Sequence, residues 1–221
     1  MTSAGAKVGR YILPPLTFAY DALAPVIDEP TLRLHHDAHH RAYVDGVNAA
    51  FAQYPEWQGL TIEEVLRRSA ALPDGIRETV RHQGGGHANH QFFWKILTPA
   101  GCGEPAGGLF GAIVRDFGSF ARFKSAFETA GMRLFGSGWV FLVCRPHRDF
   151  RLEILTLPNE DSVLSLAEPA PGLLVCDLWE HAYDLTYHNR RADWLKAWWA
   201  IVDWDLVAER LQGVREGRLQ L

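Results

Sequence analysis

The feature that most constrains this chain is a buried strand that ends in two residues able to bind a metal. Residues 172–191 read GLLVCDLWEHAYDLTYHNRR, and the apolar run near the start predicts a short buried strand. Asp177 and His181 follow it, four residues apart, where the strand gives way to a helix. A carboxylate with an imidazole suits a hard or borderline metal ion. A helix-capping aspartate with a histidine packed behind it explains the pair equally well, so a metal site needs further ligands elsewhere.

A second stretch supplies histidines. Residues 29–51 predict a helix that begins with acidic residues and an early proline. Within it, His35, His39 and Tyr43 share one face at a spacing of four residues, while His36 and His40 form a second pair turned by about 100°. This cluster indicates either a functional face or solvated histidines on a helix surface.

Another helix, from about Ile76, carries two more histidines, His87 and His90, followed by aromatic residues. Three consecutive glycines precede them, and each costs about 1 kcal/mol against alanine inside a helix. Such a run predicts the close approach of another helix, or open space beside a site. Two antiparallel helices that both bear histidines form a natural two-sided clamp for a metal ion.

The remaining pattern predicts an α+β protein of two domains. The linker 98–108 is rich in glycine and proline. We therefore expect an N-terminal domain, residues 1–98, with an extended arm and a helical hairpin, and a C-terminal α+β domain, residues 99–221. The latter should hold a three-stranded antiparallel sheet flanked by helices. Its expected elements are helices at 109–117 and 119–133, strands at 135–145, 150–157 and 172–177, and two final helices divided near 202–203.

Composition excludes several classes of function. The chain has 221 residues and a net charge of −4, which provides no basic face for nucleic acid. No run of eighteen apolar residues predicts a membrane span, and the N-terminal residues lack a secretory signal. They predict a plain disordered tail rather than the transit peptide that they faintly resemble. Three scattered cysteines form neither a disulfide framework nor a CxxC site. We expect a cytoplasmic protein.

Taken together, the motifs resemble one family, the iron/manganese superoxide dismutases, from about residue 11 to about residue 212. The segments that carry the resemblance are LPPLTFAYDAL, LHHDAHHRAYV, GGGHANHQFFW, DFGSFARFKSAF, FGSGWVFLV and DLWEHAYDLTYHNRRADWL. The resemblance implies dismutation of superoxide to dioxygen and hydrogen peroxide. It also implies a mononuclear manganese or iron site in each subunit, with a bound solvent, and a homodimer or tetramer.

The resemblance also implies a role for individual residues. The implied metal ligands are His35, His90, Asp177 and His181. The implied gateway pair of the solvent funnel is His39 and Tyr43, and Tyr43 would belong to the chain of hydrogen bonds that supplies protons. The implied aromatic wall is Trp94, Trp139 and Trp179. Glu180 would bind a ligand histidine of the opposite subunit. His36, His40 and His87 fall outside the ligand positions and are expected to play no part in binding the metal.

Glu160 departs from the family pattern. The manganese members carry a glutamine at this position, and the iron members usually carry one on the histidine-bearing helix, where this chain has Gly86. A glutamine amide can donate a hydrogen bond, whereas an ionised glutamate can only accept one. Glu160 could be ionised, could be kept protonated by burial, could bind the metal itself, or could face solvent in a shifted loop. The layout favours manganese over iron.

A second departure is Asp184, which stands where the family usually has a tyrosine that reaches His39 across the dimer interface. Asp184 would raise the proton affinity of His39 and make the funnel less attractive to anionic superoxide. Because of both departures we keep two alternatives to a dismutase. One is a non-dismutating protein that binds manganese or iron, and the other is an altered metal-dependent redox enzyme, such as a peroxidase, with Glu160 as a general base.

Overall fold

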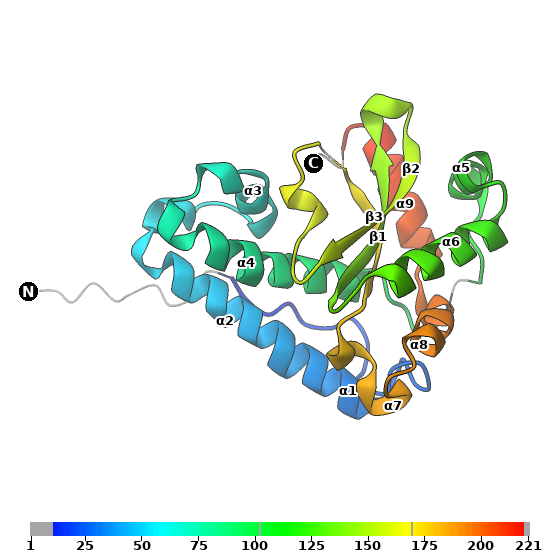
Figure 1. Cartoon of the computed structure of the whole chain (residues 1–221), viewed down its shortest axis with the longest axis horizontal. Helices are drawn as coiled ribbons and strands as arrows, with labels where there is room; N and C mark the ends of the chain where they lie inside the picture. The colour runs from blue at the N-terminus through cyan, green and yellow to red at the C-terminus, as the bar shows by residue number, and fades with distance from the viewer. Residues whose placement is uncertain (1–10, 102, 169, 219–221) are drawn as a thin grey trace, which may run out of the picture.

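A computed structural model describes residues 11–101, 103–168 and 170–218. The predicted N-terminal tail, residues 1–10, and Cys102 in the linker therefore lie outside the described residues. In Figure 1 a long helical hairpin on one side meets a three-stranded sheet that has further helices beyond it. The α+β architecture expected from the sequence is confirmed.

The first arm of the hairpin is not the uniform α-helix that the sequence predicts. It consists of α1 (Glu29–Arg33), a π-helical segment (Leu34–His40) and α2 (Arg41–Ala50). The Asp28 side chain caps the start by accepting from the Thr31 backbone N–H at 2.8 Å. All four clustered histidines lie in the π-helical segment. Such segments are rare and occur frequently at functional sites, where the wider turn re-aims side chains.

The second arm packs along α2 and explains the glycine run. After the short helix α3 (Ile62–Arg67), with a capping box at its start, comes α4 (Asp74–Lys95). A Cβ atom on Gly86 would lie 2.5 Å from Cδ1 of Tyr43, and one on Gly85 would lie 2.1 Å from the backbone oxygen of Glu160. The glycines therefore permit the close approach that the sequence predicted, to α2 at one position and to a loop at the other.

The sheet contains β1 (Gly138–Arg145), β2 (Arg151–Pro158) and β3 (Gly172–Asp177), in the order β2-β1-β3 and antiparallel throughout. Trp139 stands opposite Asp177 in the β1–β3 ladder. The chain that leaves β2 returns to this end, where the Asn159 N–H donates to the Ser137 carbonyl at 2.9 Å. One end of the sheet thus gathers Trp139, Asp177 and the loop that carries Glu160.

Helices cover the sheet and complete the core. α5 (Gly107–Phe117) and α6 (Phe120–Arg133) contact β2, while α4 and α9 (Trp204–Arg215) contact β3. The short α7 (Asp184–Tyr187) and α8 (Arg191–Trp198) lie between the sheet and α9 in sequence. The four tryptophans of the C-terminal segment are buried in this core: Trp194, Trp198, Trp199 and Trp204.

The apolar core consists of two clusters. One lies within the hairpin, around Val44, Val47 and Val80. The larger one surrounds the sheet, and it includes Leu32 and Phe93 from the hairpin. Because the hairpin packs into the larger cluster, the division at residue 98 stays a proposal. None of the helices in the described part of the chain has the combination of length and apolar character that crossing a membrane requires.

Candidate metal centre

Four side chains converge where the hairpin meets the end of β3. His35 comes from the π-helical segment, His90 from α4, Asp177 from the last position of β3, and His181 from the helical turn that follows. Each offers one ligand atom, and these atoms all lie within 4.8 Å of one another. The first three side chains are fully buried and His181 is nearly so. This spacing allows the four groups to bind one ion together.

Local hydrogen bonds orient the donors toward a common point. Nδ1 of His90 donates to the Gly86 carbonyl at 2.7 Å, which leaves its Nε2 with a lone pair. Oδ1 of Asp177 accepts from the Trp179 backbone N–H at 2.8 Å. Its Oδ2 lies 3.0 Å from Nε2 of His35 and 3.2 Å from Nε2 of His181. The ligand atoms of these side chains therefore point toward the same space.

The protonation states suit metal binding. Burial lowers the pKa of His35 to about 4 and lowers that of His90 well below its ordinary value. Burial acts to raise the pKa of Asp177, but His181 and His35 outweigh it, so the pKa lies below its ordinary value. At neutral pH His35 and His90 are therefore neutral imidazoles and Asp177 is a carboxylate, the forms in which these residues bind metals.

The donor atoms also lack other partners. Both ring nitrogens of His35 and Nε2 of His90 are buried without a hydrogen bond. A buried unsatisfied polar group costs about 1–3 kcal/mol, and a cation bound by Nε2 of His35 and Nε2 of His90 would remove that cost for these two atoms. Three imidazoles and one carboxylate fit manganese or iron, which accept nitrogen and oxygen ligands.

Aromatic rings enclose the donors, as the sequence predicts for a water-restricted site. The ring centroids of His35 and Trp94 are 4.6 Å apart, and those of His90 and Trp139 are 5.0 Å apart. Trp179 stacks on His181 at 5.6 Å. Each of the three predicted wall residues thus contacts a different candidate ligand.

Glu160 is buried and faces the site. Tyr43 donates its hydroxyl to Oε1 at 2.6 Å, and the Trp139 indole N–H donates to Oε2 at 2.9 Å. The solvent-facing position that we considered is therefore wrong. Glu160 is also absent from the four-residue cluster. Burial and the charge of Asp177 raise the pKa of Glu160 well above its ordinary value.

Comparison with known proteins agrees with this geometry. The model of the "Iron/manganese superoxide dismutases, alpha-hairpin domain" matches residues 10–98, and that of the "Iron/manganese superoxide dismutases, C-terminal domain" matches residues 105–210. The chain belongs to the iron/manganese superoxide dismutase family. It is 46% identical to the "Superoxide dismutase [Mn]" of Thermus thermophilus over 89% of this chain and 95% of that protein. It is 45% identical to the "Superoxide dismutase [Mn/Fe]" of Methylomonas sp. (strain J) over 91% of this chain and 98% of that protein.

The residues that the family resemblance places at the funnel and interface lie at the surface side of the site. His39 is half-buried and stacks on His181 at 4.3 Å. Burial lowers its pKa, and His181 acts in the same direction, whereas Asp177 and Asp184 act to raise it. Asp184 and Glu180 are exposed. The effect of Asp184 across a dimer interface stays a prediction.

Sequence reasoning missed a buried histidine pair beside the site. His36, His40 and His87 are not in the four-residue cluster, but all three are buried rather than solvated. The Trp94 indole N–H donates to Nδ1 of His40 at 3.0 Å, so Nε2 of His40 carries the proton that is shared with Nδ1 of His87 at 2.8 Å. No local pattern in the sequence signals this pair, because its two histidines are 47 residues apart and come together only in the fold.

Sequence reasoning also missed the clamp that holds the Glu160 loop on α4 of this dismutase-family chain. Arg81 donates through Nε and Nη2 to both carboxylate oxygens of Asp161, at 2.7 and 2.9 Å. The Asn89 amide donates to the Asp161 carbonyl at 3.1 Å. No single-sequence pattern pairs residues 80 positions apart, so only the fold reveals this clamp.

We predict that Arg81→Gln loosens the loop without changing the metal ligands. The ion pair is bidentate but half-exposed on the arginine side, so we expect a loss of about 1 kcal/mol of stability, or roughly 2–4 °C in Tm. Calorimetry and metal analysis would test this. Arg77→Gln is the control: this arginine is about as exposed as Arg81, at 45% against 47%, but its partner Asp74 is 91% exposed, so the pair should contribute less to stability. Equal Tm losses in both variants would contradict a special role for Arg81.

Proposed function

We propose that this chain is a superoxide dismutase that converts superoxide to dioxygen and hydrogen peroxide. The observation that carries the proposal is the convergence of His35, His90, Asp177 and His181, with ligand atoms within 4.8 Å of one another, in a chain of this family. A bound manganese or iron ion would supply one-electron redox chemistry. The four residues would hold that ion, and the tryptophans around them would limit access of bulk water.

Tyr43 and His39 are proposed to serve proton delivery. Burial and the adjacent Glu160 raise the pKa of Tyr43, so its hydroxyl keeps its proton at neutral pH. His39 is half-buried and in ring contact with His181, which places it between the site and the surface. The pair can therefore hold protons next to the site, where the product peroxide requires them.

Glu160 is proposed to control the direction of the hydrogen bond to Tyr43. An ionised carboxylate accepts a hydrogen bond from the Tyr43 hydroxyl and so directs the hydroxyl proton away from the site. A protonated carboxyl group can donate to the Tyr43 oxygen instead, as a glutamine amide would. The raised pKa of Glu160 favours the protonated form. On this proposal Glu160 positions a proton and does not bind the metal.

We propose manganese as the working metal. The absence of a glutamine at Gly86 and the carboxylate at Glu160 give a manganese-like layout, and relatives are named for manganese or for both metals. The test is dismutation by the purified chain reconstituted separately with each metal. Higher activity with manganese is expected, and higher activity with iron would reverse the assignment. Inactivity of both fully loaded forms would overturn the dismutase proposal in favour of a metal-binding relative without this activity.

We also propose that the chain works as a homodimer through the face that contains Glu180. This residue is exposed within one subunit and adjoins the candidate ligand His181. Apolar side chains are exposed as well, with 99% exposure for Phe135, 49% for Leu185 and 42% for Leu34. Contiguous exposed apolar groups mark surfaces that another protein covers, and on this proposal the three side chains belong to one such surface. A tetramer built from two such dimers is the alternative assembly.

We predict that Glu180→Gln weakens this assembly. Loss of a charged hydrogen-bond acceptor at an interface should weaken dimerisation at least about tenfold, because the partner histidine would lose its charged acceptor. Sedimentation or light scattering over a dilution series would measure it. Glu56→Gln, at an exposed glutamate of the hairpin, is the control. A variant that dimerises as tightly as the wild type would contradict the predicted role.

We propose a reducing compartment, such as the cytoplasm, as the place of action. Cys144 and Cys176 are both free and buried, and the structure does not describe the third cysteine. Fractionation of cells that express the full chain would test this placement.

A further inference from the structure

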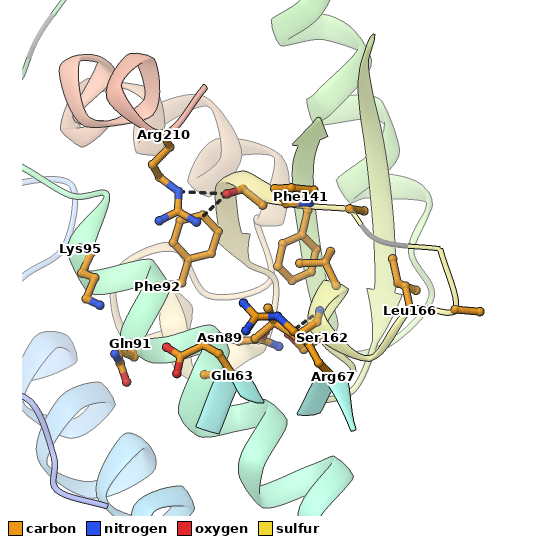
Figure 2. A pocket seen from close by; sticks show the side chains of 17 residues that line it. Glu63, Arg67, Asn89, Gln91, Phe92, Lys95, Phe141, Ser162, Leu166 and Arg210 are labelled. Atoms are coloured by element: carbon orange, nitrogen blue, oxygen red, sulfur yellow. Dashed lines mark hydrogen bonds between the residues drawn. The ribbon is translucent and has the colours of Figure 1, made fainter. Parts of the chain in front are cut away.

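A cavity of about 390 Å³ lies apart from the metal centre, between the hairpin and the C-terminal half. Its walls come from α3, α4, β1, α9 and the segment between β2 and β3. None of its lining residues belongs to the four-residue metal cluster. The volume falls in the range of about 300–1,000 Å³ that is typical of small-molecule sites. Figure 2 shows Arg210, Phe92 and Lys95 along one side, with Phe141 and Leu166 across from them.

Arg210 is the unusual feature of this cavity. Its Nε and Nη2 both donate to the Gly172 carbonyl, at 2.9 and 2.7 Å, and its guanidinium lies 4.2 Å from the centroid of the Phe92 ring. Burial lowers its pKa to about 10, although the charge of Glu63 acts to raise it. No carboxylate in the described part of the chain forms an ion pair with it. Arg210 is partly exposed, and the partners of its guanidinium are a backbone carbonyl and an aromatic ring, so a carboxylate can still pair with it.

Most of the other charged residues in the lining are cations, like Arg210. Besides Arg210 it includes Lys95 and Arg67, against one acidic residue, Glu63. Lys95 is exposed at the rim, and within the described residues it has no ion-pair partner. Arg210 and Lys95 therefore make their side of the cavity attractive to an anion. Because Nε and Nη2 of Arg210 are occupied by Gly172, Nη1 remains for a small, singly charged head group.

Part of the cavity lining is apolar. It includes Phe92 from α4, Phe141 from β1, and Val163, Leu164 and Leu166 from the segment after the Glu160 loop. An inorganic anion would leave these side chains uncovered. An apolar chain attached to the anion would cover them and gain about 0.8 kcal/mol for each buried CH₂ group.

We propose that this cavity binds a small amphipathic carboxylate. Its head group lies at Arg210 and Lys95, and its apolar chain lies against Phe92, Phe141 and Val163. This assignment is independent of the dismutase proposal, because it uses no residue of the metal centre. The carboxylate of the ligand is then the ion-pair partner of the Arg210 guanidinium.

Calorimetric titration of the metal-loaded full chain tests the proposal. Sodium octanoate is the probe, with octanol to represent the chain alone and sodium sulfate to represent the anion alone. We expect octanoate to bind at one site per chain with a Kd of about 1 mM or tighter, and octanol and sulfate to bind at least about tenfold more weakly. Equal binding of octanol would remove the role of the cations, and equal binding of sulfate would leave a simple anion site. Either result, or no saturable octanoate binding, overturns the proposal.

Two charge variants locate the head group. Arg210→Gln should weaken octanoate binding at least about tenfold, with circular dichroism to verify the fold. Lys95→Glu gives an independent answer if Arg210→Gln fails to fold, because this side chain is exposed; it should also weaken binding about tenfold. The matched control is Lys196→Glu, at an exposed lysine of α8 outside the cavity. Unchanged binding in Lys95→Glu, or an equal loss in Lys196→Glu, contradicts the assigned position.

Discussion

Glu160→Gln is expected to raise kcat/KM for superoxide by about tenfold at alkaline pH. The side-chain amide can accept from the Trp139 indole and donate to the Tyr43 oxygen, so both contacts of Glu160 survive. The Tyr43 hydroxyl then no longer donates its hydrogen bond to residue 160, so its proton becomes available to the site. Proton transfer by a positioned group contributes about 10²–10⁴-fold to catalysis, so a tenfold gain represents recovery of part of it. Pulse radiolysis or stopped-flow kinetics on manganese-loaded protein would measure the change.

The sign of the pH dependence follows from the raised pKa of Glu160. At low pH the carboxyl group is neutral and can donate, so wild type and variant should be similar. As pH rises through the raised pKa, the wild type acquires a buried negative charge and loses activity, while the glutamine variant does not. Glu209→Gln, at an exposed glutamate, is the control for the loss of one negative charge. A ratio of variant to wild-type activity that stays constant with pH would contradict this account.

Asp177→Asn is expected to abolish stable metal binding and the stabilisation that metal confers. A ligand present at one hundred times its Kd stabilises the folded state by about 2.7 kcal/mol, equivalent to roughly 5–10 °C in Tm for a chain of this size. The wild type should show this shift on addition of manganese. The variant should not, because it loses the only anionic donor of the four. Differential scanning calorimetry and elemental analysis would measure both effects.

The metal-free forms provide an internal check on Asp177. This carboxylate is fully buried, and its neighbours in the cluster are histidines. An amide at the same position loses the interactions with His181 and His35 that hold the pKa of Asp177 below its ordinary value, so the metal-free variant should unfold at a lower temperature than the metal-free wild type. Asp193→Asn, at an exposed pair with Arg190, is the control and should keep the metal-dependent shift. A shift retained by Asp177→Asn would show that the ion binds elsewhere.

Much of the fold followed from local signals. The capping box at Thr61, the cap at Ser119 and the hairpin between β1 and β2 each depend on a few neighbouring residues. The glycine run before His87 predicted a close approach because its cost within a helix needs compensation. The four proposed ligands followed from motifs in three separate segments, which the structure brings within 4.8 Å.

Other features depended on packing between distant segments. The π-helical segment at Leu34–His40 differs from an α-helix only in hydrogen-bond register, which residue types alone do not reveal. The direction of Glu160 depends on Tyr43 and Trp139, which are far from it in the sequence. The burial of His87 depends on the opposite arm of the hairpin. For each of these, long-range contacts outweigh local preference.

The tight contact between Gly86 and the ring of Tyr43 limits the routes by which this site can evolve. A side chain at residue 86 cannot enter while Tyr43 holds its present position, because its first atom would lie 2.5 Å from the ring. If a side chain at residue 86 of α4 were to take over the role proposed for Glu160, Tyr43 would therefore have to shift as well. Substitutions at residues 86 and 160 must then be strongly epistatic, since each is tolerated or harmful according to the other.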